Sequence, residues 1–390
     1  MLRAGAGLST QRDSARAAAE AATFALRSAE LERADLLLVF ATTAHGPGFT
    51  LVTRTAGEVC GTAQVVGCSA AGVLAGDEEV EGGPAVAVLA LGGDFAARRF
   101  FVPLTRGRAE RAADEILDAV GVGEGGARLL VLFGDTYHLE PEPLLHGLRQ
   151  RLPGVTVVGG GASEDGSVGE VSVFSGDAAS SAAVAGVMLE GDLRATVGVT
   201  HAVRRVSPVW RVTAARGNWL IALDGRPAYE AFASVVPSPL RAEPRRALAA
   251  VLAGLVVGED EFVARHLLAL DAEHGALAVA APVAEGQRVF FGVRDPLGAR
   301  EDLQRVLADQ AATWPTPAAA ALYVTCVGRG RGFYGVPGLE SAYLRQHLGT
   351  VPVAGFFSGA EFGPGAEGTR LHQYTGVLTM LGPGACQGRR

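Results

Sequence analysis

The sequence predicts an α/β protein in which strand–bend–helix–strand units are repeated, forming mixed sheets that helices cover and two halves that pack together. The first observation is a short apolar strand that runs into a glycine-rich bend, which occurs three times: residues 65–72, 157–164 and 353–362. The second is that each copy follows an earlier, continuously apolar run of the kind shown by strands buried on both faces. Such repetition indicates one supersecondary unit that is used several times.

The spacing inside the three units is nearly constant. The first apolar strand and the glycine of the motif lie about 30 residues apart in every case. The three intervals run from Leu36 to Gly67, from Leu129 to Gly159 and from Leu322 to Gly355. This interval leaves room for a bend and a helix, so each unit is expected to be βαβ-like with a right-handed crossover. Ligands of open α/β sheets bind beyond the carboxyl ends of the strands, where the three bends should lie.

The termini of the repeated region contain further expected elements. Apolar residues at helical spacing predict an N-terminal helix from Asp13 to about Glu32, with Ser9 or Thr10 as its cap. Residues 217–228 are typical of a hairpin turn that leads into a helix. The domain boundary is therefore expected near Arg216, between a domain of residues 1–215 and one of residues 216–390.

Composition excludes several classes of function. The chain has 390 residues, 48 % of them apolar, and a net charge of −7 with acidic and basic residues interspersed, so no clustered basic face for nucleic acid is expected. No lysine occurs, which excludes P-loop enzymes and enzymes that form a Schiff base through a lysine.

Cysteine usage and hydropathy indicate a location. The four cysteines contain no Cys-x-x-Cys pair, which fits a reducing compartment. The N-terminus lacks a basic-then-apolar signal pattern, and the longest apolar runs, such as residues 182–189, are too short to span a bilayer. The sequence predicts a cytoplasmic protein with no membrane partner.

Motifs in both halves resemble a known family. They are residues 66–69 with Ala71 and Gly72, residues 223–228, residues 355–358 with Glu361, then residues 363–364, 371–372 and Thr375. Taken together, these motifs resemble FIST N followed by FIST C, a bacterial signal-transduction module, over nearly the whole chain. The resemblance implies a sensory protein that binds small ligands, amino acids among them. Some stand-alone members are similar haem proteins that sense nitric oxide and regulate a separate histidine kinase.

Two residues depart from the family pattern. Val73 stands where the family usually has a glutamate in the N-terminal half, which puts a ligand contact there in doubt. Ala360 replaces the glycine before Glu361. If that position requires a positive φ, alanine would cost about 1 kcal/mol or shift the bend.

The three bends are expected to line the ligand site. Their serines and backbone N–H groups would bind a carboxylate, and the Glu361 carboxylate would bind an amine. The histidine that precedes the last strand would be a ligand contact or an axial haem ligand, with His138 as the alternative haem ligand. The predicted ligand-binding residues are Cys68, Ser69, Gly160, Ser163, Phe357, Ser358, Glu361 and His372.

The sequence supports a metal site or a cysteine hydrolase less well than a ligand-binding site. Asp135, His138 and Glu140 lie close together, but a bend does not ensure the three convergent ligands that a metal needs, so this segment is expected at a pocket rim and no metal is predicted. Cys68 on its tight turn suggests a hydrolase, yet the nucleophile-elbow pattern fails because Ala71 replaces the final glycine. The sequence therefore favours a small-ligand sensor that is not an enzyme, with a haem-based gas sensor as the alternative.

Overall fold

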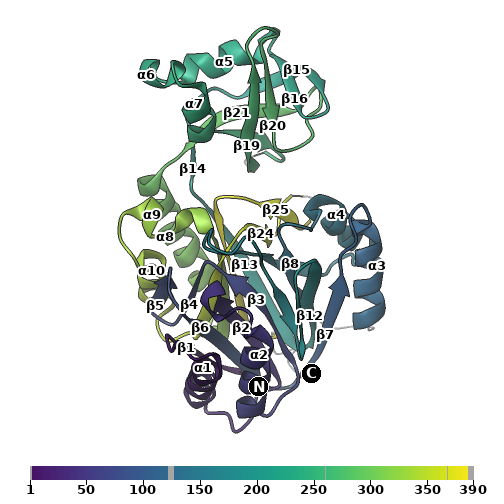
Figure 1. Ribbon diagram of the computed structural model, residues 1–390, viewed down its shortest axis with the longest axis vertical. Coiled ribbons are helices and arrows are strands. Elements are labelled where there is room, and N and C mark those ends of the chain that lie inside the picture. Colours follow the sequence, from purple (N-terminus) through teal and green to yellow (C-terminus); the bar gives the residue numbers. More distant parts are fainter. Residues whose placement is uncertain (1, 122–126, 260, 367, 385–390) are drawn as a thin grey trace. The chain divides into compact units, whose positions relative to one another are not determined.

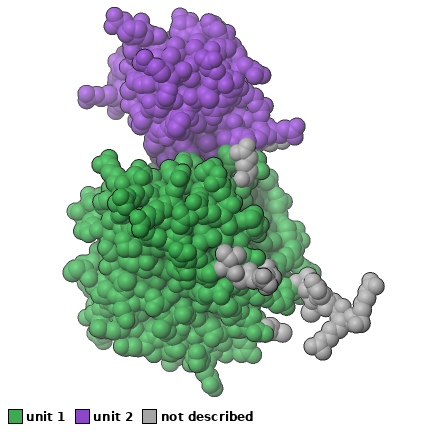
Figure 2. All heavy atoms as spheres, turned by 90° about the vertical axis from the view of Figure 1, so that its right-hand side faces the viewer, with its two compact units in different colours: residues 1–200, 303–371, 375–390 green, residues 201–302, 372–374 purple. Residues whose placement is uncertain are grey.

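The computed structural model describes residues 2–121, 127–259, 261–366 and 368–384, which fall into two compact units (Figures 1 and 2). Unit 1 comprises residues 1–200, 303–371 and 375–390, and unit 2 comprises residues 201–302 and 372–374. Unit 1 contains helices and mixed sheets, and unit 2 contains helices and antiparallel strands, so the predicted α/β class is confirmed. The expected boundary at Arg216 falls inside unit 2, at the turn between two of its strands.

The described part of unit 1 contains one order of eight elements three times, and the three predicted strand–bend–helix–strand units are the central part of it. Repeat 1 consists of β1 (Arg3–Ser9), α1 (Ser14–Ala29), β2 (Leu36–Thr42), α2 (Phe49–Cys60), β3 (Val65–Ala70), β4 (Gly72–Ala75), β5 (Glu78–Glu81) and β6 (Val86–Gly92). Repeat 2 consists of β7 (Phe95–Pro103), α3 (Ala109–Val120), β8 (Ala127–Asp135), α4 (Pro141–Arg151), β9 (Thr156–Ala162), β10 (Val173–Ser175), β11 (Ala178–Ser180) and β12 (Ala183–Gly191). Repeat 3 consists of β13 (Leu193–His201), α8 (Pro296–Ala312), β22 (Ala320–Cys326), α10 (Leu339–Leu348), β23 (Val353–Ser358), β24 (Ala360–Gly363), β25 (Arg370–His372) and β26 (Thr375–Pro383).

Each repeat builds one sheet around a parallel pair of strands. The pairs are β2–β3, β8–β9 and β22–β23, and each is flanked by an antiparallel strand from the same repeat: β6, β12 or β26. The strand after the glycine bend leaves its own sheet and completes another. Strand β4 of repeat 1 pairs with β23 of repeat 3, β24 of repeat 3 with β9 of repeat 2, and β10 of repeat 2 with β3 of repeat 1. We call this closed cycle of exchanged strands the strand-exchange ring.

The glycine of each motif lets the two parallel strands lie side by side. A Cβ atom on Gly67 would lie 1.7 Å from the carbonyl oxygen of Val39 on the preceding strand. On Gly159 it would lie 2.0 Å from that of Leu132, and on Gly355 1.8 Å from that of Tyr323. No side chain fits at such distances, so close backbone approach explains why the motif recurs.

The three sheets enclose one apolar core and carry helices on their outer faces. Phe40, Phe133 and Phe356 meet in this core, with ring centroids 4.8 to 5.7 Å apart. The outer faces pack against α1 with α2, α3 with α4, and α8 with α10, as the ribbon shows (Figure 1). The apolar runs of the central strands are therefore buried on both sides, as their lack of alternation predicted.

Most of unit 2, residues 202–295, is inserted into repeat 3 between β13 and α8. Its described strands pair antiparallel, most of them in a closed cycle, and its core includes Trp210, Phe232 and Phe291. Its elements are β14 (Val203–Arg205), β15 (Trp210–Arg216), β16 (Trp219–Leu223), β17 (Arg226–Pro227), α5 (Ala228–Val235), α6 (Ser238–Arg241), α7 (Pro244–Ala250), β18 (Val251–Val256), β19 (Phe262–Asp271), β20 (Ala276–Val279) and β21 (Arg288–Arg294). The predicted hairpin and helix at residues 217–228 match β16, β17 and the start of α5.

The first helix is found as predicted, but its predicted cap, Ser9 or Thr10, is wrong. Helix α1 begins at Ser14, and its cap is Asp13, whose side chain accepts a hydrogen bond from the Arg16 N–H at 2.8 Å. Ser9, the expected cap, ends strand β1. The strand was missed because residues 3–9 are mostly alanine and glycine, which carry little strand signal. Among the described helices, none is both long and apolar enough to cross a bilayer.

Candidate functional site

The three predicted serines are buried and bind backbone groups near the strand-exchange ring. Ser69 Oγ donates to the Ser163 carbonyl at 3.3 Å and accepts from the Ser172 N–H at 2.9 Å. Ser163 Oγ donates to the Phe357 carbonyl and accepts from the Ala71 N–H. Ser358 Oγ donates to the Gly161 carbonyl at 2.9 Å. These bonds join neighbouring repeats, and the predicted role of the serines as ligand contacts stays a prediction.

Cys68, Gly160 and Phe357 also lie in the interior. Cys68 is fully buried, and this burial raises the pKa of its thiol well above the ordinary value. A Cβ on Gly160 would lie 2.5 Å from Ser358 Oγ, so glycine is required for this close contact. Phe357 is only 2 % exposed. In the described structure these three positions serve packing, and their binding role is likewise a prediction.

Glu361 breaks the pseudo-symmetry of unit 1. The exchanged strands pair at equivalent positions, with Val73 opposite Phe356, Val173 opposite Cys68, and Glu361 opposite Gly160. All three residues on the exchanged strands are fully buried. Two repeats thus fill this position with valine, and the third places a carboxyl group there. The register agrees with the family resemblance, because Val73 stands where the FIST pattern has a glutamate.

The environment of Glu361 favours its neutral form. Thr375 donates to Oε2 through its N–H at 3.2 Å and its hydroxyl at 2.8 Å. Burial raises the pKa of Glu361 to about 8, although the Thr375 hydrogen bonds, the Arg329 charge and the Cys326 thiol act in the opposite direction. At pH 7 the group is therefore mostly protonated. Ala360 is absent from the residues with positive φ, so the expected strain at this position is not found.

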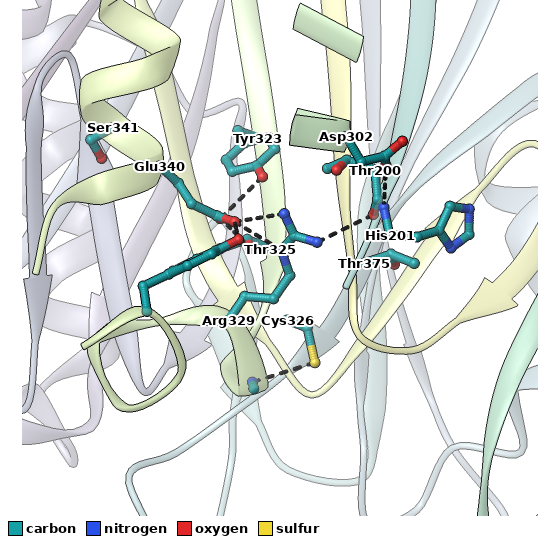
Figure 3. Close-up of polar contacts among 12 residues, drawn as sticks. Thr200, His201, Asp302, Tyr323, Thr325, Cys326, Arg329, Glu340, Ser341 and Thr375 are labelled. Carbon is teal, nitrogen blue, oxygen red and sulfur yellow. Dashed lines mark hydrogen bonds and ion pairs between the residues drawn. The ribbon is translucent and has the colours of Figure 1, made fainter. Parts of the chain in front are cut away.

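Repeat 3 also contains a buried ion pair (Figure 3), whose arginine lowers the pKa of Glu361 through its charge. Arg329, in the short helix η2 (Val327–Arg329) that follows β22, donates through Nε to Glu340 Oε1 at 2.8 Å. Arg329 is fully buried and Glu340 is 2 % exposed. Tyr334 in the short helix α9 (Arg331–Tyr334) also donates to Oε1, at 2.7 Å. Tyr323 and Thr325 on β22 donate to Oε2 at 3.0 and 2.6 Å.

The charges of this pair are strongly coupled. Burial lowers the pKa of Arg329, but the Glu340 carboxylate outweighs it, so the net pKa is raised and the guanidinium stays charged. The pKa of Tyr334 is also raised, by burial and then by the same carboxylate. We call Arg329, Glu340, Glu361, Thr325, Tyr334 and Thr375 the repeat 3 cluster.

Arg329 and Glu340 were not predicted from the sequence. The sequence does contain a pattern that points to Arg329. The first strand of each parallel pair ends at an equivalent position: Thr42, Asp135 and Cys326. These residues pair with Ala70, Ala162 and Ser358 on the second strand. The third residue after each of these strand ends is basic: His45, His138 and Arg329. Only the tertiary structure shows that Arg329 meets a carboxylate.

The two histidines proposed for haem differ in their surroundings. His138 has a side chain that is 55 % exposed, and its Nδ1 lies 2.7 Å from Oδ2 of the buried Asp135. His372 belongs to unit 2 and is 5 % exposed, with its ring centroid 6.3 Å from that of His201. His138 is thus the better placed of the two for an external ligand. No group of three metal-ligating side chains occurs among the described residues.

Family models match most of the chain: FIST N over residues 35–226 and FIST C over residues 228–364. The protein belongs to the FIST family. FIST domains are sensory, ligand-binding modules of signalling proteins. This FIST protein is 30 % identical over 387 residues to an uncharacterised protein of Mycobacterium tuberculosis strain H37Rv, covering 97 % of this chain and 100 % of that protein. An uncharacterised protein of Mycobacterium bovis is also 30 % identical, with 97 % and 99 % covered.

Solved structures with some likeness to this FIST protein include two of cyanuric acid hydrolase. The one from A. caulinodans has a TM-score of 0.36 and 10 % identity, covering 99 % of this chain and 100 % of that chain. The other has a TM-score of 0.36 and 9 % identity, covering 98 % of this chain and 100 % of that chain.

The Glu361 carboxyl is expected to make the stability of the FIST protein depend on pH. Its pKa is about 8 when folded, against an ordinary value of 4.5, so between these values the folded state holds a proton that the unfolded state has lost. Its contribution to stability is full below pH 4.5, falls as the pH rises, and is lost above pH 8. The Glu361→Gln variant keeps a neutral side chain throughout. We expect it to match the wild type at pH 5 and to exceed it by roughly 2 to 4 kcal/mol at pH 9.

Urea denaturation of both proteins at several pH values measures this difference. Glu78→Gln on the exposed edge of β5 is the control for removal of an exposed carboxylate. A Glu361→Gln curve parallel to that of the wild type from pH 5 to 9 would show that Glu361 ionises normally.

Proposed function

We propose that this FIST protein is a cytoplasmic sensor of a small polar metabolite that carries an amine, such as an amino acid, and that the repeat 3 cluster is its binding site. The observation that carries the proposal is Glu361, a buried carboxyl at a position where Val73 and Val173 satisfy the same fold. A carboxyl buried there is unfavourable for stability compared with valine. Buried acids with shifted pKa values concentrate at functional sites.

The chemistry of the cluster suits an amine. An ammonium group next to Glu361 would favour its charged form, and Thr375 already directs an N–H and a hydroxyl to the same carboxyl. Arg329 and Glu340 form an ion pair and neutralise each other, so together they add no net charge beside Glu361. Binding of the ammonium form at neutral pH should therefore displace a proton from Glu361.

The surroundings of Cys68 argue against the hydrolase alternative. Thiols react as thiolates, and a reactive cysteine lies in a partly exposed, electropositive place. Cys68 is fully buried and the pKa of its thiol is raised by burial. A ligand-induced signal would pass to a separate protein, such as a histidine kinase, by shifting the populations of conformations of the sensor.

Calorimetry with a panel of amino acids and other small amines tests this proposal. A ligand at 100 times its dissociation constant should stabilise the protein by about 2.7 kcal/mol in a parallel thermal melt. For the ligand that binds, titrations at pH 6.5 in two buffers of different ionisation enthalpy should show release of about one proton, and at pH 9 almost none.

Glu361→Gln keeps the shape of the side chain and removes its charge. We expect it to weaken binding at least tenfold and to abolish proton release, whereas Glu78→Gln should change neither. A panel in which no amine binds, or an amine that binds Glu361→Gln as tightly as the wild type, would refute the proposed site. A haem sample in the panel tests the gas-sensor alternative, with a Soret band that His138→Ala or His372→Ala should remove.

A further inference from the structure

A cavity of about 520 Å³ lies at the end of β2 in repeat 1, and no residue of the repeat 3 cluster lines it. Its walls come from three segments of the chain: the turn after β2, the start of α2, and the residues around the β10–β11 hairpin of repeat 2. The lining residues used below are Thr43, Phe49, Thr50, Glu170, Ser172 and Ser180. The carboxyl ends of strands are the usual place for ligands in α/β sheets, and the volume is in the range of small-molecule sites.

The inner walls of this cavity are anchored to the core. Ser172 exchanges two hydrogen bonds with the buried Ser69: its N–H donates to Ser69 Oγ at 2.9 Å, and its carbonyl accepts from the Ser69 N–H at 2.8 Å. Phe49 is 8 % exposed, and its ring packs 5.2 Å from that of Phe174. Ser69, predicted from the sequence as a ligand contact, thus lies behind the wall of this cavity.

The lining indicates the class of ligand. Five hydroxyl side chains line the cavity, each able to donate and to accept a hydrogen bond. Glu170 is the single charged side chain in the lining, and no arginine or histidine accompanies it. An anion would meet this carboxylate without a compensating cation. A neutral molecule with several hydroxyl groups would satisfy both Glu170 and the hydroxyl side chains, and its apolar C–H faces would pack on Phe49 and its apolar neighbours.

We propose that this cavity is a second binding site, for a small neutral polyhydroxylated molecule such as a monosaccharide or polyol. The site is independent of the one proposed at Glu361. The two differ in location, in charge and in the repeats that build them.

Saturation-transfer NMR on the full chain, with D-glucose, myo-inositol and sorbitol as probes and putrescine as a cationic comparison, tests the proposal. At least one polyol should bind the wild type, and calorimetry then gives its dissociation constant. Ser180→Phe, an exposed substitution at the rim, should abolish binding by filling the cavity. Glu170→Gln removes the charge and keeps the shape, and it should weaken binding about three- to tenfold.

Glu32→Gln, at an exposed position away from the cavity, is the matched control and should bind like the wild type. Glu361→Gln should also bind the polyol normally, which separates this site from the proposed sensor site. Failure of every polyol to bind, binding of putrescine alone, or polyol binding that survives both Ser180→Phe and Glu170→Gln would each overturn the proposal.

Discussion

The Gly355→Ala variant is expected to lose more than about 4 kcal/mol of stability, and in practice to be recovered mainly as insoluble protein. The added Cβ would lie 1.8 Å from the Tyr323 carbonyl oxygen and 2.7 Å from its carbon. Both are backbone atoms of the paired strand β22, so no side chain can move aside. Relief would require β22 and β23 to separate, which breaks the parallel ladder at the centre of the sheet. Soluble yield and urea denaturation measure the effect.

Gly332→Ala is the control for this substitution. Gly332 lies in α9, and a Cβ there would meet nothing within 4 Å. This variant should stay within about 0.5 kcal/mol of the wild type. Gly67→Ala and Gly159→Ala should lose stability as Gly355→Ala does, because the same backbone contact occurs in their repeats. Wild-type stability in any of the three would mean that the parallel strands are farther apart than described.

The second large effect is expected from Glu340→Ala. It leaves the Arg329 guanidinium fully buried without its carboxylate, and removes the acceptor used by Tyr323, Thr325 and Tyr334. Loss of one partner of a buried ion pair costs about 3 to 5 kcal/mol. Urea denaturation at pH 7 gives the difference in unfolding free energy. The double variant Arg329→Met/Glu340→Leu should regain part of the loss, since it buries no unpaired charge.

Glu115→Ala is the matched control, because it breaks an exposed pair with Arg111 at 3.0 Å on α3. Exposed pairs of this kind contribute about 0.5 kcal/mol or less. If Glu340→Ala costs no more than Glu115→Ala, the pair in repeat 3 is hydrated and the cluster is open to water. If the double variant is as unstable as Glu340→Ala, the hydroxyl contacts rather than the charge account for the loss.

The repeats could be predicted from the sequence because each depends on contacts between segments that are close together in the chain. Gly67, Gly159 and Gly355 are required by contact with the strand just before them, so their spacing records the βαβ unit directly. The exchange of β4, β10 and β24 was not predictable, because nothing within a short strand tells which sheet it joins. The insertion of unit 2 was hidden for a similar reason, since β13 and α8 are joined into one repeat only by tertiary contacts.

The site could be predicted only in part. Glu361 was predicted as a ligand contact because it follows the glycine bend of an apolar motif, and that role stays a prediction. The structure places it at a position where the equivalent residues are Val73 and Val173. The serines were noticed for the same reason, yet their hydroxyls bind backbone groups of neighbouring repeats. Arg329 and Glu340 come from a bend and a helix whose sequences say nothing about their distance. A polar residue next to a conspicuous glycine can therefore have a structural role that the sequence does not show.

The strand-exchange ring has a consequence for how the chain acquires its fold during synthesis. Val73 and Phe356 are partners, yet all of repeat 2 and residues 201–302 of unit 2 are translated between them. Contacts so distant in sequence slow folding. Strand β4 has no β23 to pair with until β23 emerges from the ribosome. Strand β9 likewise cannot pair with β24 until β24 has been synthesised. Nascent chains would therefore expose open strand edges for most of translation, and such edges invite aggregation. Protection of these edges by a chaperone matters more for this fold than for a protein whose repeats each close their own sheet.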